Sequence, residues 1–274
     1  MAYQPEAPLT LEVITATLGP NALPRTILYH ETIGSTMDLA RSQLQQLPVE
    51  RLPILVVADE QTAGRGRQGR SWVAPPGTAL LTSLALRPDQ LPAAQGVALI
   101  WMLAVALCEA IEELTHLRPW LKWPNDLLLY DPAVGWAKAA GMLLEVNLRT
   151  DRVEWAILGC GINLYASPPV GSTNYPATNL AAAGAAVTRL QLLEALLRHT
   201  EPWYHQVRRG ETHALFAAWR TRLHTLGQTV TITTSQGRFS GLAEAVTTSG
   251  SLLVRDADGW LHTITTGDVG LVGV

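Results

Sequence analysis

The spacing of apolar residues changes near Gly227, and this change constrains the fold more than any other feature of the chain. Ahead of it, continuous apolar runs at residues 54–58 and 79–86 predict buried strands, and residues 96–114 predict a helix. Behind it, short alternating segments at residues 229–233, 238–246, 251–254 and 260–265 are separated by glycine-containing turns and predict a small β-barrel. We therefore predict an α+β domain over residues 1–226 and a C-terminal barrel domain over residues 227–274.

Further segments of the first domain extend the α+β pattern. Residues 26–29, 127–130, 141–148 and 153–159 predict strands, and residues 9–18 predict a helix too short for a DNA-binding winged helix. Ser35, with Asp38 three positions further on, predicts the N-cap of a helix that continues to residue 47. Residues 190–223 predict two helices, broken near Pro202 and Gly210.

The composition is that of an ordinary globular protein, with 47% hydrophobic and 16% charged residues in a chain of 274. A net charge of −3 and a pI near 6.2 argue against a DNA partner. The longest apolar stretch, residues 96–108, is too short for a bilayer span, so we expect no membrane attachment. Two cysteines without a signal peptide predict a cytoplasmic protein. The seven histidines form no ligand pair, so we predict no metal site built by the protein alone.

Lysine is rare in this chain. Arginine supplies 18 of the 20 basic residues, and the two lysines are Lys122 and Lys138. A coding bias would explain the arginine excess equally well. It explains less well why lysine, a compact ammonium on a flexible stem, remains at these two positions. Both lysines are therefore candidates for a site.

The segment from Gln61 to Trp72 is the most informative part of the chain. It follows a predicted buried strand and interleaves glycines with cations: Gly64, Arg65, Gly66, Arg67, Gly69 and Arg70. From Gln61 to Pro88 the only charged residues are these three arginines and Arg87. Backbone freedom beside uncompensated positive charge suits an anionic ligand, and the alternative is a solvated arginine loop. The glycines formally match a dinucleotide-binding fingerprint, but that motif must open a helix, and here Pro75-Pro76 and another strand follow.

Three later segments also combine polar groups with glycine or a rigid turn. Lys122-Trp-Pro-Asn-Asp126 predicts a rigid corner that, taken alone, favours a surface turn, and that holds Lys122 at the end of an element. Lys138-Ala-Ala-Gly141 precedes a predicted strand, and its glycine would let a ligand approach the backbone. Gly159-Cys-Gly-Ile-Asn163 ends another strand. Its cysteine has no basic partner nearby in sequence, so a packed residue is favoured over a nucleophile.

Taken together, these segments resemble the biotin–protein ligase (holocarboxylase synthetase) family. The arginine–glycine segment with Trp72 and the three later segments occur in the family's order, and Ser35-Thr36 occupies the place of its Ser-Thr-Asn. Three departures stand out. Met37 replaces the usual asparagine, Gln68 stands where arginine is common, and the connection from Asp126 to Lys138 is a few residues long. The resemblance is to the ligase-only subclass, without a DNA-binding domain.

The resemblance implies a fold and a reaction. The fold is α+β, with a mixed β-sheet catalytic domain similar to class II aminoacyl-tRNA synthetases and an SH3-like C-terminal barrel. The reaction joins biotin and MgATP as biotinyl-5′-AMP, and a lysine of a carboxylase's biotin carboxyl carrier domain then takes the biotin. The cofactors are thus ATP, with its Mg²⁺, and biotin as substrate. The barrel would help to close the site or present the carrier, and a homodimer is an open option.

The resemblance also assigns residues. Lys122 and Arg67 would be catalytic. The biotin site would contain Ser35, Thr36, Gln61, Gly64, Arg65, Gly66, Arg67, Lys138, Gly141 and Gly159. The ATP site would contain Arg67, Arg70, Trp72, Lys122, Asn125 and Asn163, with Trp72 either packing on adenine or sealing the loop. The loop from Arg65 to Arg70 is expected to become ordered when ligand binds.

Two other functions stay open. A lipoate–protein ligase or octanoyltransferase has the same fold and also transfers an acyl group to a carrier lysine. A non-catalytic biotin-binding module belongs to a different class, and its most plausible output, DNA binding, has no matching segment in this sequence.

Overall fold

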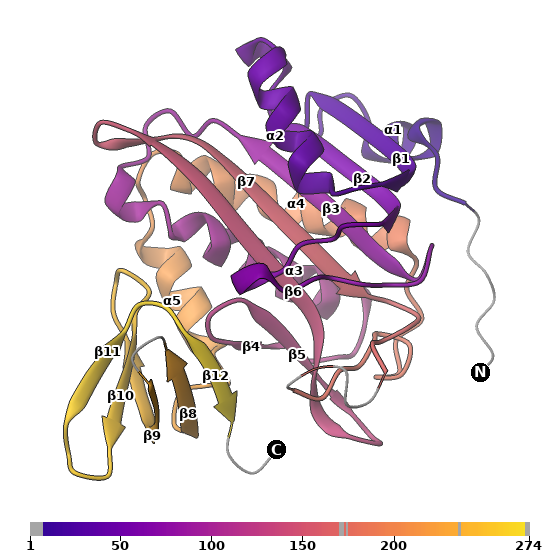
Figure 1. Ribbon diagram of the computed structural model, residues 1–274. Coiled ribbons are helices and arrows are strands. Elements are labelled where there is room, and N and C mark those ends of the chain that lie inside the picture. Colours follow the sequence, from indigo (N-terminus) through magenta and orange to yellow (C-terminus); the bar gives the residue numbers. More distant parts are fainter. Residues whose placement is uncertain (1–7, 170–172, 174, 235–236, 272–274) are drawn as a thin grey trace.

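The computed structural model describes residues 8–169, 173, 175–234 and 237–271 (Figure 1). A seven-stranded sheet forms the body of the molecule, with spatial order β1 (Thr26–Ile33), β2 (Ile54–Gln61), β3 (Ala79–Leu86), β7 (Arg152–Asn163), β6 (Gly135–Arg149), β5 (Asp126–Asp131) and β4 (Trp120–Lys122). The pair β1–β2 is parallel and the other neighbours are antiparallel. The predicted α+β class with a mixed sheet is confirmed.

Helices cover both faces of this sheet. They are α1 (Leu11–Leu18), α2 (Thr36–Gln46), α3 (Ala98–Leu114), α4 (Arg189–Val207) and α5 (His213–Thr221). Along β2, Ile54 and Val56 pack in one cluster with α2, whereas Leu55 and Val57 pack in the main core with α3. A strand segment buried on both faces is mostly apolar, which is why residues 54–58 of β2 and most of β3 were predictable as apolar runs, although β3 also buries Thr82 and Ser83.

The helix α3 lies at the centre of the core. The expectation that the apolar stretch here is too short for a bilayer span is wrong, because Ala93–Leu114 is apolar and long enough to cross a membrane. However, 72% of its most apolar window is buried inside the protein. Its length follows from packing against α4 and the sheet. The predicted helix is confirmed, although its α-helical part begins at Ala98 and a separate 3₁₀ turn, Ala93–Gln95, precedes it.

The predicted break near Pro202 is wrong, because α4 runs through this proline. A proline inside a helix costs about 3 kcal/mol. A capping box joins Thr188 and Gln191 at the helix start. Leu193 and Leu196 are buried in the core that α4 shares with α3. The capping box and this burial together outweigh the cost of the proline. The break near Gly210 is confirmed, since that residue adopts a positive φ of 78° between α4 and α5.

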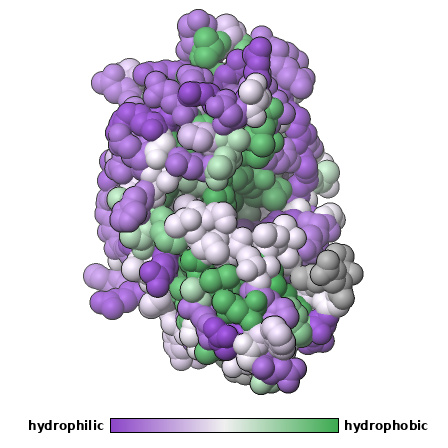
Figure 2. All heavy atoms as spheres, turned by 90° about the vertical axis from the view of Figure 1, so that its left-hand side faces the viewer, coloured by the Kyte–Doolittle hydropathy of each residue, from purple (hydrophilic) through white to green (hydrophobic). Residues whose placement is uncertain are grey.

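The C-terminal unit is a five-stranded antiparallel sheet with spatial order β11 (Leu261–Ile264), β10 (Leu252–Asp256), β9 (Gly237–Val246), β8 (Thr229–Thr234) and β12 (Asp268–Leu271). Four of its strands, β8 to β11, were predicted, and β12 was missed, since its four residues include Gly270 and no alternating pattern leads into them. Apolar side chains are visible on the lower part of the face in Figure 2, where this unit lies. Its exposed apolar residues include Leu242, Trp260 and Leu261.

Candidate active site

A cavity of about 710 Å³ lies among the large sheet, the arginine–glycine segment and the C-terminal unit. All predicted site residues except Gly64 line it: Ser35, Thr36, Gln61, Arg65, Gly66, Arg67, Arg70, Trp72, Lys122, Asn125, Lys138, Gly141, Gly159 and Asn163. The C-terminal unit adds Thr231, Thr233, Arg238 and Asp268 to the wall. This unit therefore helps to enclose the cavity, as expected.

One cross-strand row aligns the motifs beneath this cavity. Lys122 on β4 pairs with Asp126 on β5, Asp126 with Gly141 on β6, and Gly141 with Gly161 on β7. Paired residues point their side chains to the same face of a sheet, and neighbouring strands lie about 4.8 Å apart, so the row spans roughly 14 Å. Segments that are remote in sequence thus form one continuous floor.

The arginine–glycine segment forms a short hairpin-like loop between β2 and β3. Gly66 donates a backbone hydrogen bond to the Arg70 carbonyl at 2.7 Å, and Trp72 donates one to the Gly64 carbonyl at 2.9 Å. A Cβ on Gly64 would lie 2.3 Å from the Trp72 carbonyl oxygen, so a glycine is needed where the two ends of the loop approach each other. A single 3₁₀ turn, Arg67–Gly69, lies within the loop. A dinucleotide-binding fingerprint would open an α-helix here, so the structure agrees with the rejection of that motif.

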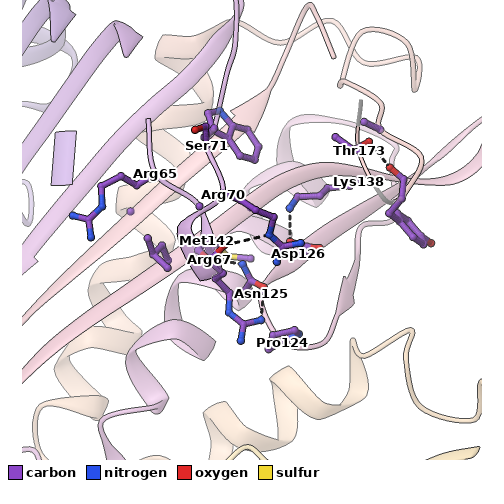
Figure 3. Close-up of a pocket in the computed structure, with 18 of the residues that line it drawn as sticks. Arg65, Arg67, Arg70, Ser71, Pro124, Asn125, Asp126, Lys138, Met142 and Thr173 are labelled. Atoms are coloured by element: carbon purple, nitrogen blue, oxygen red, sulfur yellow. Dashed lines mark hydrogen bonds and ion pairs between the residues drawn. The ribbon is translucent and has the colours of Figure 1, made fainter. Parts of the chain in front are cut away.

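The three loop arginines have different partners (Figure 3). Arg65 extends away from the Asp126–Lys138 pair and binds carboxylates of α2 and β6, and Arg70 contacts Asp268 at 2.7 Å. The sequence showed no acidic neighbours for this loop, so the expectation of uncompensated charge is wrong for these two. Their partners come from distant segments.

Arg67 is the loop cation whose hydrogen bonds go to uncharged groups. Its guanidinium lies 3.4 Å from both the Asn125 side-chain oxygen and the Gly267 carbonyl oxygen. Burial lowers its pKa below the ordinary value, an effect that the carboxylates of Asp268 and Asp126 oppose. Arginine remains charged at physiological pH, so Arg67 offers an unneutralised charge to an anionic ligand.

The corner after β4 is buried. Trp123 and Pro124 are joined by a cis peptide bond, and Trp123 is 2% exposed. Its backbone N–H donates to the Thr225 hydroxyl at 2.9 Å and its indole N–H donates to the Gly250 carbonyl at 2.8 Å. The alternative of a surface turn is therefore wrong, and the reason is that the C-terminal unit covers the tryptophan.

Both lysines of the chain face one carboxylate. Asp126 lies 2.6 Å from the Lys138 ammonium and 3.7 Å from that of Lys122, which also lies over the Tyr175 ring. Burial lowers the pKa of Lys122, whereas the Asp126 charge raises it. Lys138 lies inside β6, which begins at Gly135 rather than at the predicted Gly141. Sequence reasoning did not single out Asp126, although its spacing of four from Lys122 was a usable signal.

Hydroxyl and amide groups gather at the other side of the cavity, above β2 and β3. The Gln61 side-chain oxygen accepts hydrogen bonds from the backbone N–H and the hydroxyl of Thr36, at 2.8 and 3.0 Å. The Ser83 hydroxyl lies 2.8 Å from that of Thr36. Ser35 occupies the predicted N-cap position of α2, but its side chain makes no capping hydrogen bond. Its buried hydroxyl has no hydrogen-bond partner among the described residues, which suits a ligand.

Large side chains occupy the space that the floor glycines leave. A Cβ on Gly141 or Gly161 would lie 2.9 or 2.4 Å from the indole of Trp72, whose N–H is buried without a partner among the described residues. A Cβ on Gly159 would lie 2.6 Å from the Met37 sulfur. Trp72 thus covers the floor of the cavity in the structure. Gly141 makes room for the Trp72 indole, in addition to the ligand contact that was predicted for it. Gly161 was not predicted as a site residue.

Two remaining groups have contrasting chemistry. The Asn163 amide donates to the Thr178 carbonyl at 3.0 Å, and its buried side-chain oxygen has no hydrogen-bond partner among the described residues. Burial raises the pKa of Cys160 to about 12, which agrees with a packed thiol rather than a nucleophile. Within the described part of the chain, no three His, Cys, Asp or Glu residues are placed to hold a metal ion.

Comparison with known proteins places the chain in a family. A model of the biotin/lipoate A/B protein ligase family matches residues 29–163, and a model of the biotin protein ligase C-terminal domain matches residues 225–272. The chain is 31% identical over 249 residues to the bifunctional ligase/repressor of Bacillus subtilis, covering 88% of this chain and 73% of that protein. It is 34% identical over 212 residues to the biotin–[acetyl-CoA-carboxylase] ligase of Paracoccus denitrificans, covering 74% of this chain and 85% of that protein.

A solved structure agrees with this placement. The biotin protein ligase from Aquifex aeolicus in complex with biotin and ATP matches with a TM-score of 0.71 at 25% identity, over 90% of this chain and 98% of that chain. The two family models match residues of both the large sheet and the C-terminal unit. The chain therefore belongs to the biotin protein ligase family.

Proposed function

We propose that this protein is a biotin–protein ligase, which forms biotinyl-5′-AMP from biotin and ATP and transfers the biotin to a lysine of a carboxyl carrier domain. The observation that carries the proposal is the cross-strand row that aligns Lys122, Asp126, Gly141 and Gly161 below one cavity. Hydroxyl and amide groups lie at one side of this floor and cations at the other. Such a cavity suits an elongated ligand with a polar head and a carboxylate tail.

The head of biotin is a cyclic urea, which both donates and accepts hydrogen bonds. The unpartnered Ser35 hydroxyl and the Thr36–Gln61 pair supply matching groups beside β2 and β3. Met37 and Trp72 supply apolar contact over the glycine floor. These groups would orient the ligand with its carboxylate toward Lys122.

The first step needs positioning and charge neutralisation more than a protein nucleophile. The biotin carboxylate attacks the α-phosphorus of ATP, a P–O bond forms, and pyrophosphate leaves with the electron pair of the bond that breaks. Lys122 and Arg67 would stabilise the negative charge on the phosphate oxygens, and the Lys122 side chain is only 7% exposed. In the second step, the amine of the carrier lysine attacks the carbonyl of the mixed anhydride and AMP leaves.

Magnesium would enter with ATP. Among the described residues that line the cavity, the carboxylates are Asp126 and Asp268, and both are paired with cations. The free side-chain oxygen of Asn163 is a ligand type that Mg²⁺ accepts, together with phosphates and water. The residues thus fit an ion held mainly by the nucleotide, with Asn163 and the nearby Asn125 toward it.

Several finer statements belong to this proposal. The C-terminal unit would be an SH3-like barrel, separated from the catalytic domain at residue 227, and the large sheet would resemble class II aminoacyl-tRNA synthetases. The match to a biotin protein ligase C-terminal domain supports the first point. Two buried, unpaired cysteines support a cytoplasmic location. The partner would be the carrier domain of a carboxylase, as the name of the Paracoccus relative indicates for that protein.

Biotin-dependent exchange of pyrophosphate into ATP, measured without any carrier, tests the proposal. We expect exchange with biotin, none with lipoate and none without an acid. Exchange with lipoate alone would indicate a lipoate ligase. Tight biotin binding by folded protein without exchange would indicate a binding module. Transfer to a purified carrier domain tests the second step.

A further inference from the structure

Residues 222–225, the linker that leaves α5 toward the C-terminal unit, run along the outer edge of β4. Leu121 of β4 exchanges two backbone hydrogen bonds with this linker, both 2.8 Å long. The backbone N–H of Trp123 donates to the Thr225 hydroxyl at 2.9 Å. These hydrogen bonds hold the residues on either side of Lys122.

Lys122 is therefore fixed from both edges of its strand. On the inner edge its backbone pairs with Asp126 of β5. On the outer edge, the N–H that Thr225 accepts belongs to the peptide group that directly follows Lys122. Thr225 is fully buried and Trp123 is 2% exposed, so water cannot replace this acceptor. A buried N–H without an acceptor is costly, which leaves this peptide group one favoured orientation.

The turn that carries Gly250 fixes the other end of the tryptophan. The indole N–H of Trp123 donates to the Gly250 carbonyl at 2.8 Å. Gly250 has a φ of +84°, and a Cβ on it would lie 3.1 Å from side-chain carbons of both Trp101 and Val97. The turn is thus seated against the start of the core helix α3. The linker and this turn together hold Trp123 by its backbone and by its indole.

We propose that Thr225 is a positioning residue that, together with the Gly250 turn, sets the place of Lys122 through Trp123. The C-terminal unit then acts in the first step of the reaction, in addition to closing the site or presenting the carrier. The inference deepens the proposed function and rests on it only for its catalytic consequence. A displaced ammonium would stabilise the developing phosphate charge less well, because such stabilisation depends on a preorganised position.

Digestion of the ligand-free full chain with endoproteinase Lys-C tests this hold directly. The chain has two lysines, Lys122 and Lys138, so the two possible cleavage sites report on two different strands of one sheet. Thr225→Val keeps the shape of the side chain and removes the acceptor. It should raise cleavage at Lys122 about tenfold and cleavage at Lys138 less than about twofold, because cleavage follows the population of the locally open form.

Two variants control for general damage. Thr225→Ser keeps the hydroxyl and should cleave as the wild type does. Thr200→Val removes another buried hydroxyl, which donates to the Leu196 carbonyl at 2.7 Å within α4, away from β4. It should leave cleavage at Lys122 within about twofold of the wild type. Wild-type cleavage at Lys122 in Thr225→Val, or an equal increase at both lysines, would overturn the proposal.

Biotin-dependent pyrophosphate exchange separates positioning from substrate binding. Thr225→Val should lower kcat about tenfold and leave the Michaelis constants for ATP and biotin within about twofold, and Thr225→Ser should restore most of the rate. Unchanged kcat with a raised Michaelis constant for biotin would overturn the proposal. Absence of exchange in the wild type would refute the proposed function, and the Lys-C digestion would still decide whether the linker holds Lys122.

Gly250→Ala disturbs Trp123 from its other end, and Gly259→Ala is the matched control. Gly259 has a similar φ of +87°, and a Cβ on it would meet nothing within 4 Å. Both variants therefore carry the cost of alanine at a positive φ, and only Gly250→Ala also moves the turn against α3. It should lower kcat about fivefold more than Gly259→Ala does. Equal exchange rates in the two variants would overturn the role given to the Gly250 turn.

Discussion

Replacement of Lys122 by methionine should separate catalysis from stability. The side chain keeps its length and loses its charge. If Lys122 stabilises the charge that develops as the carboxylate attacks phosphorus, losing this contact should lower kcat about 10²- to 10³-fold. The Michaelis constant for ATP should change much less, because Arg67 and the backbone of the loop remain.

The expected effect on stability is small. At 3.7 Å from Asp126, the Lys122 ammonium gains an attraction of the order of 4 kcal/mol at an effective dielectric constant of 20. Burying an ammonium costs several kcal/mol, which roughly cancels that gain. Asp126 keeps Lys138 at 2.6 Å, so no carboxylate is left unpaired. We expect the free energy of unfolding to change by less than about 2 kcal/mol.

The pH dependence follows from the burial of Lys122, which lowers its pKa. Activity that needs the charged amine should fall as the pH rises through this lowered pKa. Over the interval up to its ordinary pKa, the unfolded chain binds more protons than the native chain, so the contribution of Lys122 to stability rises with pH. The methionine variant should lose both dependences.

Biotin-dependent pyrophosphate exchange at varied ATP concentration measures the rate effect, and urea unfolding measures stability. Lys138→Met is the comparison variant, because it removes the other lysine from the same carboxylate. A Lys122→Met enzyme with wild-type turnover and only a raised Michaelis constant would refute the reasoning and assign Lys122 to uniform binding.

Three further predictions concern the loop, the floor and the thiol. Arg67→Ala should release biotinyl-adenylate to solution, detected as labelling of lysines on an added bystander protein; unchanged labelling would argue against retention by this charge. Gly159→Ala should push the Met37 sulfur, which would lie 2.6 Å from the new Cβ, into the cavity. The Michaelis constant for biotin should then rise, at a cost of only about 1 kcal/mol of stability. Adding Met37→Ala to the same chain should restore binding. Cys160, whose pKa burial raises to about 12, should resist iodoacetamide in the native state, and ready alkylation would contradict its burial.

Sequence patterns predicted the elements whose residues are buried on both sides. β2, β3 and α3 were predictable because their buried parts are long, mostly apolar runs. The strand β4 has only three residues, and the four residues of β12 include a glycine, so neither gives a clear periodic signal. The helix through Pro202 depends on packing against α3, which no local rule contains.

For the candidate site, local motifs predicted which residues line the cavity better than they predicted which residues contact one another. Every predicted residue except Gly64 lines the cavity, because backbone glycines and clustered cations have few other uses. The partners of Arg65 and Arg70 come from residues far along the chain, so their pairing required the fold. The position of Trp72 over Gly141 likewise depends on how β6 and the loop meet. The polar residue Ser83 in an otherwise mostly apolar strand was a signal that could have been used.

The sharing of one carboxylate by both lysines has a consequence for self-modification. An acyl-adenylate that escapes into solution reacts with exposed, uncharged amines, and arginine guanidinium groups do not provide them. The side chains of Lys122 and Lys138 are only 7% and 28% exposed, and both amines lie beside Asp126. Biotinyl-adenylate that leaves the cavity therefore meets almost no side-chain amine on the ligase that made it. It should acylate neighbouring proteins rather than the ligase itself.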